Sequence, residues 1–209
     1  MQLVLVRHAQ PRREFTTTGP ADPDLTDLGI EQATRVPAAL TRLEVAGHRI
    51  TRVVSSPQRR ARETAGPTAD KLDLSLDIHP GLAEYDADLP LYIPIEDAKQ
   101  QFRATYERIK AGYLPEQIDG PAFVDRVRAA VGEITAAADH SDTVVAFAHG
   151  GVINVLLQDV LDLDRPLTFP IDYCSITRIL YSRTGRRTAA TVNENGHVWD
   201  LLPRNLAAD

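Results

Sequence analysis

Apolar residues recur along the chain at two spacings, one typical of strands and the other of helices. Short apolar and β-branched runs, and later alternating patterns, predict strands at 3–6, 52–55, 74–79, 143–148, 175–182 and 188–198. Segments between the first of these have helical spacing, which predicts helices over 28–43, 61–72, 123–138 and 152–161. Strands that alternate with helices predict an α/β fold, with a mostly parallel central sheet and helices on both faces.

Turn residues set the expected limits of two helices. Thr26 is a suitable N-cap for the first helix, and Gly47 ends its apolar pattern. Pro37 lies inside that pattern, so we expect a kink or a break there. Ser56 and Pro57 are typical of a cap followed by a proline in the first helical turn.

Residues 83 to about 120 differ in their residue pattern from the rest of the chain. Prolines and glycines interrupt this segment, and a charged helical piece lies near its middle, at about 96–110. We expect an insertion that covers the carboxyl ends of the strands, within a single domain spanning 1–209. Aromatic side chains of this segment can line a pocket, although packing is their more ordinary role: Tyr85, Tyr92, Phe102, Tyr106 and Tyr113.

Composition and charge narrow the classes of function. The 209 residues carry a formal net charge of -6, so the chain lacks the basic surface of a general nucleic-acid binder. The single cysteine, Cys174, excludes an internal disulfide and a multi-cysteine metal site, and we expect it to be buried in a strand. The apolar run at 1–6 is too short for a signal peptide or a membrane span, and no other stretch approaches the necessary length, which predicts a cytoplasmic protein.

Residues suited to chemistry follow three of the predicted strands. Arg7 and His8 come after the first strand, Ser56 follows the second, and His149 with Gly150 follows the strand at 143–148. In open α/β sheets, ligands bind outside the carboxyl ends of the strands. This rule selects two histidines and an arginine as the candidates for catalysis.

Four segments carry a recognisable pattern: LVRHAQ at 5–10, DLTDLG at 24–29, SSPQRRARETA at 55–65 and AHGGVI at 148–153. In this order they resemble the motifs of the histidine phosphatase superfamily, also called phosphoglycerate mutase-like. The resemblance spans nearly the whole chain apart from the segment at 83–120.

The resemblance implies a role for each residue in these motifs. His8 is the nucleophile that becomes transiently phosphorylated, Arg7 and Arg60 bind the phosphoryl oxygens, and His149 donates a hydrogen bond to them. Arginine suits this task because its planar fork donates two parallel hydrogen bonds and stays ionised. The neighbouring arginines also favour the neutral imidazole that His8 needs for attack. The amide of Gly150, opening a helix, adds positive potential.

Motif spacing selects the second arginine and the proton donor. It selects Arg60 rather than Arg59, which can form a surface pair with Glu63 four residues on. The family's acidic residue lies in a leucine-any-glutamate pattern after the third strand, and Leu82-Ala83-Glu84 fits that pattern. Glu84 is therefore the candidate acid, and later the base that activates water. Asp86 is the alternative for this role.

The chain departs from the family pattern at three places. Ala9 stands where many relatives have glycine, and Glu14 stands where many have a phosphate-binding asparagine. An acid cannot do that work beside phosphate, so either the loop has a different shape or the site is altered. Gln10 can supply a neutral donor instead. The residues after Glu84 also lack the glycine and tryptophan that many members carry there.

These observations predict a phosphomonoester hydrolase that acts on a small molecule and needs neither metal nor other cofactor. A metal site on His8 and His149 is disfavoured, because neither has a carboxylate or another histidine at close ligand spacing. Two alternatives stay open: a phosphoglycerate mutase-type phosphotransferase, and a phospho-ligand or protein-binding module with little turnover. The physiological substrate and the oligomeric state are not encoded in these motifs.

Overall fold

A mixed, mostly parallel sheet of six strands forms the centre of the molecule, in the order β4-β3-β6-β1-β7-β8. The computed structural model describes residues 1–206, apart from the side chains of Glu96, Lys99 and Gln100. The strands are β1 (Gln2–Arg7), β3 (Ile50–Ser55), β4 (Leu76–Ile78), β6 (Thr143–Ala148), β7 (Ile176–Tyr181) and β8 (Arg187–Glu194). The first four run parallel, and β7 pairs antiparallel with both β1 and β8. The predicted fold class is confirmed.

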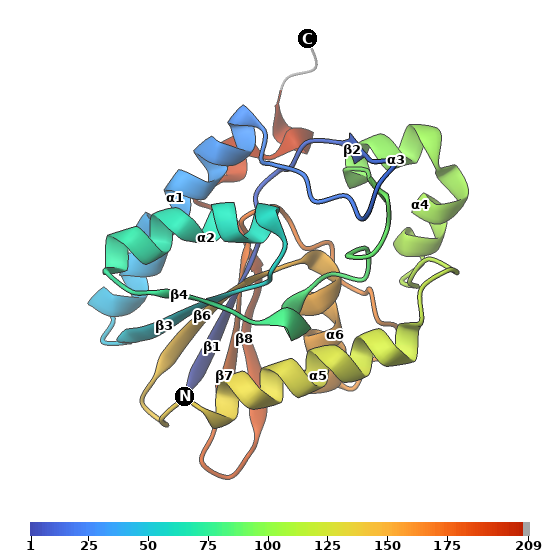
Figure 1. Ribbon diagram of the computed structural model, residues 1–209. Helices are drawn as coiled ribbons and strands as arrows, with labels where there is room; N and C mark the ends of the chain where they lie inside the picture. Colours follow the sequence, from blue (N-terminus) through green and yellow to red (C-terminus); the bar gives the residue numbers. More distant parts are fainter. Residues whose placement is uncertain (207–209) are drawn as a thin grey trace.

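Helices cover both faces of the sheet, two on each side (Figure 1). One face carries α1 (Asp27–Val45) and α2 (Arg59–Leu72), and the other carries α5 (Gly120–Ala136) and α6 (Gly150–Leu161). Strand β1 packs against both layers, because Val4 and Val6 face the first pair of helices while Leu3 and Leu5 face the second. A strand buried on both faces must be apolar throughout, which explains the run that predicted it.

Helix α1 begins where the sequence predicts, but it does not break at its proline. Thr26 is the N-cap, and its hydroxyl accepts a hydrogen bond from the amide of Gly29 over 2.9 Å. The helix continues through Pro37, so a break there is wrong, and of the two expectations only the kink stays a prediction. Val36 and Leu40 on either side of the proline are fully buried. Their packing offsets the cost of about 3 kcal/mol that an interior proline imposes on a helix.

The second helix begins after the cap that Ser56 and Pro57 suggested. Its N-cap is Gln58 and its first residue is Arg59, so Ser56 and Pro57 precede it. The hydroxyl of Ser56 lies 2.7 Å from Nε2 of His149. The predicted capping role of Ser56 is therefore wrong, because the N-cap is Gln58, and the hydroxyl of Ser56 instead contacts His149, 93 positions away.

The segment at 83–120 contains short elements joined by loops. A strand, β5 (Leu91–Tyr92), pairs with β2 (Glu14–Phe15) from the loop after His8, and the helices α3 (Ile95–Gln101) and α4 (Arg103–Lys110) follow. Figure 1 shows β2, α3 and α4 at the end of the molecule toward which β1 runs. The charged piece predicted at about 96–110 is thus two helices that meet at Phe102.

Short 3-10 helices complete the described chain: η1 (Pro80–Leu82), η2 (Trp199–Leu201) and η3 (Pro203–Asn205). None of the helices within residues 1–206 combines the length and the apolar character that crossing a bilayer requires.

Candidate active site

The carboxyl ends of β3, β6 and β1 lie side by side in the sheet, and they bring the candidate residues together. The register pairs Arg7 with Ala148, so His8 and His149 leave adjacent strands at the same level. Their ring centroids are 5.1 Å apart, and the rings are tilted by 56°. Ser56 leaves β3 beside them, with its amide bonded to the carbonyl of Phe147 over 2.9 Å. The candidates that the strand-end rule selected therefore lie together.

The imidazole of His8 is held with one nitrogen bound and the other available. Nδ1 lies 2.7 Å from the carbonyl oxygen of Ala9. Because a carbonyl can only accept, Nδ1 carries the proton and Nε2 carries the lone pair. Burial, with Arg60 and Arg7 nearby, lowers the pKa of His8 well below its ordinary value, despite the opposing bond to Ala9. This neutral tautomer is the one that a nucleophile requires.

His149 has the complementary arrangement. Its Nε2 lies 2.7 Å from Oγ of Ser56, and that oxygen also accepts the amide of Gln58 over 3.3 Å. In the tautomer in which this hydroxyl donates to Nε2, the ring proton is on Nδ1. Nδ1 of His149 is buried and has no hydrogen-bond partner among the residues that the structure describes. Burial, then Arg60, keeps the pKa of His149 well below its ordinary value, so this ring offers a neutral N–H donor.

Arg60 is a deeply buried charged side chain beside the histidines, with 1% of its surface exposed. Its Nη2 donates to Oδ1 of Asp86 over 2.7 Å, and its guanidinium carbon lies 4.5 Å from the ring centre of Tyr92. Nε and Nη1 are buried without a hydrogen-bond partner among the described side chains and backbone. Two charged donors are thus oriented but not used by the protein itself.

Its neighbour Arg59 lies outside this cluster. Nη1 of Arg59 pairs with Asp24 over 2.6 Å, with both side chains about half exposed. The carboxylate of Glu63 accepts the backbone amide of Leu25 instead. The expected pair between Arg59 and Glu63 is therefore replaced by a longer-range one, because the loop before α1 lies against the start of α2.

Arg7 is oriented by the loop that precedes β7. Its Nη1 donates to the carbonyl of Ile171 over 2.5 Å, and its guanidinium lies 4.1 Å from the ring centre of Tyr173. A Cβ added to Gly150 would come 3.8 Å from Nε of Arg7, so the start of α6 lies beside the arginine.

Cys174 is buried, but it precedes β7 with a positive φ of 55°, and its amide donates to the carbonyl of Arg7.

Glu84 lies at the N-terminus of α6 and is 6% exposed. Its Oε2 accepts the amide of Gly151 over 2.7 Å, and Oε1 accepts the amide of Tyr85 over 3.1 Å. Burial, followed by repulsion from Asp86, raises the pKa of Glu84 to about 7, although both amides and Arg60 oppose the shift. A carboxyl group with this pKa can give and take a proton near neutrality.

Several residues that the sequence did not single out hold this cluster in place. Arg126 of α5 donates to the carbonyls of Gly81 and Ala83 and so fixes the approach to Glu84. Thr64 of α2 accepts the amide of Ala9, the residue after the proposed nucleophile, over 2.9 Å. The sequence offered one clue to Thr64, namely its position one helical turn after Arg60 in the same motif. On a predicted amphipathic helix, the sequence alone does not distinguish Arg126 from an arginine that is exposed to solvent.

The loop after His8 accounts for the two unusual residues there. Oε1 of Gln10 accepts the hydroxyl of Thr26 over 3.0 Å, which ties the loop to the start of α1. Glu14 lies in β2 opposite Tyr92, and its Oε2 accepts the amide of Asp22 over 2.6 Å. The carboxylate of Glu14 thus closes its own loop, which is consistent with a loop of different shape from that of relatives with asparagine there.

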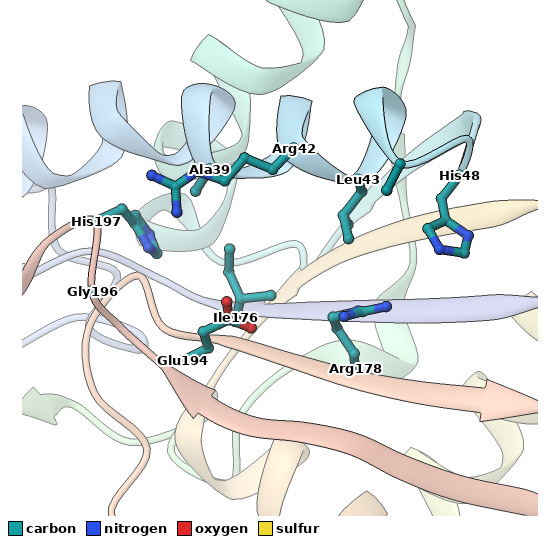
Figure 2. Close-up of a pocket in the computed structure, with 10 residues that line it drawn as sticks. Ala39, Arg42, Leu43, His48, Ile176, Arg178, Glu194, Gly196 and His197 are labelled. Carbon is teal, nitrogen blue, oxygen red and sulfur yellow. The ribbon is translucent and has the colours of Figure 1, made fainter.

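A groove of about 380 Å³ lies between α1 and β7 (Figure 2). None of the predicted site residues lines it; its walls include Arg42, Arg178, His48 and Glu194. His197, at one end, lies 3.0 Å from the carbonyl of Cys174 through its Nε2. In the part of the chain that the structure describes, no group of three His, Cys, Asp or Glu side chains is placed to hold a metal ion.

Comparison with known proteins gives one matching family and several similar structures. The model of the histidine phosphatase superfamily (branch 1) matches residues 3–194. A curated relative, "Putative phosphoserine phosphatase 2" of Hydrogenobacter thermophilus, is 29% identical over 187 residues, covering 85% of this chain and 88% of the relative.

Solved structures agree with the sequence match. A mycobacterial glucosyl-3-phosphoglycerate phosphatase in complex with inorganic phosphate superposes with a TM-score of 0.71 at 26% identity, covering 94% of this chain and 99% of the other. The alpha-ribazole phosphatase of Shigella flexneri superposes with a TM-score of 0.68 at 22% identity, covering 93% and 96%, and shows the shared fold.

Proposed function

The chain belongs to the histidine phosphatase superfamily (branch 1), and on this premise we propose that it hydrolyses phosphomonoesters through a phosphohistidine on His8. That it is a phosphatase of this family follows from the family match and from similar solved structures. The roles of the individual residues are our proposal. The substrate is a small molecule, and the reaction uses no metal or other cofactor.

One observation carries the proposal: the side chains that neighbour His8 hold buried nitrogen donors that have no hydrogen-bond partner in the described chain. Nε and Nη1 of Arg60 and Nδ1 of His149 are of this kind within the described chain. Leaving such a donor unsatisfied costs about 1–3 kcal/mol, and more when it is charged. A tetrahedral dianion supplies three acceptor oxygens at once, so a phosphoryl group fits this set of donors. Arg7, the amide of Gly150 and the side-chain amide of Gln10 complete the binding site.

In the first step, Nε2 of His8 attacks phosphorus in line with the ester bond. The nitrogen–phosphorus bond forms while the bond between phosphorus and the leaving oxygen breaks. Arg7, Arg60 and His149 stabilise charge on the three remaining oxygens. Glu84 gives its proton to the departing alcohol, since an alkoxide is a poor leaving group near neutral pH.

In the second step, water attacks the phosphohistidine. The carboxylate of Glu84 takes one proton from the water as the oxygen–phosphorus bond forms. The nitrogen–phosphorus bond breaks, which returns His8 to its neutral form and releases inorganic phosphate. Glu84 ends the cycle protonated, as it began.

The segment at 83–120 supports a role in substrate choice. Tyr92 in this segment packs on Arg60, and Asp86 pairs with the same guanidinium, so the insertion reaches the phosphoryl-binding residues directly. Names of relatives indicate phosphoserine and glucosyl-3-phosphoglycerate as substrates of those proteins. We propose that this segment is a lid over the site and that it selects among small phosphomonoesters.

The test is phosphate release from a chromogenic phosphomonoester by wild type, His8→Ala and His140→Ala. His140 contacts the N-terminus at the surface and is a matched control. Loss of activity in His8→Ala alone, with an acid-labile phosphoenzyme trapped in wild type, is the expected result. Equal background rates for wild type and His8→Ala would instead identify a binding module. In a parallel assay with phosphoglycerate as the substrate, isomerisation without phosphate release would identify a mutase.

A further inference from the structure

The side chain of Gln58 bridges two parts of the active site that come from distant segments. Its Oε1 accepts the amide of Glu84 over 2.7 Å, and its Nε2 donates to Oδ1 of Asp86 over 3.1 Å. The same Oδ1 accepts Nη2 of Arg60 over 2.7 Å. Gln58 is 6% exposed, so water competes little for these bonds. An amide is the group that this position needs, because it must accept on one side and donate on the other.

The backbone of Gln58 is itself fixed within the site. Its carbonyl accepts the amides of Ala61 and Arg62 in the first turn of α2. Its own amide donates to Oγ of Ser56, which in turn contacts His149. The bridging side chain therefore starts from a rigid point between a strand end and the helix that carries Arg60.

We propose that Gln58 is a positioning residue that sets the location of Glu84 relative to Arg60. The inference rests on the proposed function, in which Glu84 is the proton donor and Arg60 binds the phosphoryl group. The bond to the amide of Glu84 fixes the donor's backbone. The bond to Asp86 fixes the carboxylate that orients the guanidinium. Without the amide, both groups lose a constraint, and displacements of about 1 Å in a reacting group can cost on the order of 10²-fold in rate.

Leaving groups of different acidity separate positioning of the donor from a general structural role. Glycerol phosphate releases a poor leaving group that needs a proton, whereas dinitrophenyl phosphate releases a stable phenolate that does not. We would measure kcat/KM for both esters, since this quantity reports the steps up to formation of the phosphoenzyme.

The variants are Gln58→Leu and the isosteric Gln58→Glu, which keeps an acceptor for Glu84 but places a carboxylate against Asp86. The control is Gln2→Leu. Gln2 is also buried and bonded on both sides, to Arg178 and Thr143, but lies at the opposite end of β1. Gln2→Leu therefore removes a buried, hydrogen-bonded glutamine amide, as Gln58→Leu does, but leaves the active site untouched.

We expect both Gln58 variants to lose roughly ten-fold or more in kcat/KM for glycerol phosphate, with a smaller loss for dinitrophenyl phosphate. Gln2→Leu should leave the ratio of the two unchanged. Equal losses for both esters, or losses no larger than those of Gln2→Leu, would overturn the positioning role. His8→Ala, inactive on both esters in the same assay, keeps this outcome distinct from failure of the proposed function itself.

Discussion

Oε2 of Glu84 accepts the amide of Gly151 over 2.7 Å, so the proposed proton donor rests directly on the first turn of α6. The contact is possible because position 151 has no side chain. A Cβ built there would lie 2.3 Å from Oε1 of Glu84 and 2.9 Å from Cδ1 of Tyr85. The absence of one methyl group thus determines where the carboxyl group can sit.

Gly151→Ala should therefore displace Glu84 while leaving the fold intact, because the atoms that must move are side-chain atoms of Glu84 and Tyr85 rather than backbone. We expect kcat/KM for an alkyl phosphate to fall on the order of 10²-fold. Gly132→Ala is the control: position 132 lies in α5 and has open space, so alanine there should keep the rate and stabilise the helix by up to about 1 kcal/mol. Equal rates for the two variants would show that the contact has no catalytic meaning.

Arg60 and Arg59 are adjacent in sequence, but we expect opposite results from replacing them. Arg60→Ala removes buried charged donors beside His8, and we expect a loss of roughly 10²-fold or more in kcat. Arg59→Ala removes a half-exposed pair with Asp24, and such pairs contribute about 0–1 kcal/mol to stability and nothing to the reaction. Steady-state kinetics with one ester compares the two. A rate for Arg60→Ala within a few-fold of wild type would reject its role.

Strands β1 and β6 and their ends were predictable from the sequence because burial on two faces leaves a continuous apolar run, whereas the short strands β2 and β5 were missed. The rule for strand ends then placed His8, His149 and Arg7 at one edge, and the structure brings them together. The second arginine needed motif spacing, since composition alone cannot separate Arg60 from Arg59. Contacts between loops were out of reach: the pairing of Arg59 with Asp24 spans 35 residues and follows no periodicity.

The same limit applies to the network around Glu84. Gln58 meets Asp86 across 28 residues, and Arg126 meets Ala83 across 43, so these bonds depend on how separate segments cross in space. Pro37 fails as a helix breaker for a related reason: tertiary packing of its neighbours outweighs local preference.

The pH dependence should follow the protonation of Glu84. The donor must carry a proton in the first step, and burial with repulsion from Asp86 raises its pKa to about 7. We therefore expect kcat/KM for an alkyl phosphate to decline as the pH rises through about 7. Because the pKa of His8 is lowered by burial and the arginines, protonation of the nucleophile should reduce activity only below its ordinary value of 6.5.

Asp86→Asn tests the cause of this decline. Removing the negative charge beside Glu84 lowers its pKa, so the decline should begin at a lower pH than in wild type. Dinitrophenyl phosphate, which needs no proton from the donor, should lack the decline in both proteins. A decline at the same pH in wild type and Asp86→Asn would mean that a different group controls it.

Asp172 provides a prediction about the loop that orients Arg7. Its carboxylate accepts hydrogen bonds from Asn193, Asn195 and Arg204, and Ile171 in the same loop accepts Nη1 of Arg7. Burial opposes ionisation of Asp172, but these bonds outweigh it and lower the pKa. Asp172→Asn keeps one acceptor oxygen, but its NH₂ group is a donor that faces the donors of Asn193, Asn195 and Arg204. We expect about 1–3 kcal/mol less unfolding free energy at neutral pH, and a lower kcat/KM as Arg7 loses its support.

The sign of the pH effect distinguishes this network from a surface pair. A carboxylate whose pKa is lowered by folding stabilises the protein above its unfolded pKa, and that contribution is lost as the pH falls through the folded pKa. The stability difference between wild type and Asp172→Asn should thus be full at neutral pH and shrink below 3.8, the ordinary aspartate value. Denaturant unfolding at several pH values measures it. Asp200→Asn breaks an exposed pair with Arg35, which is worth little in water, and should change neither stability nor rate appreciably. If both variants were equally stable and equally active, the loop would not depend on Asp172, and Ile171 and Tyr173 would orient Arg7 without its help.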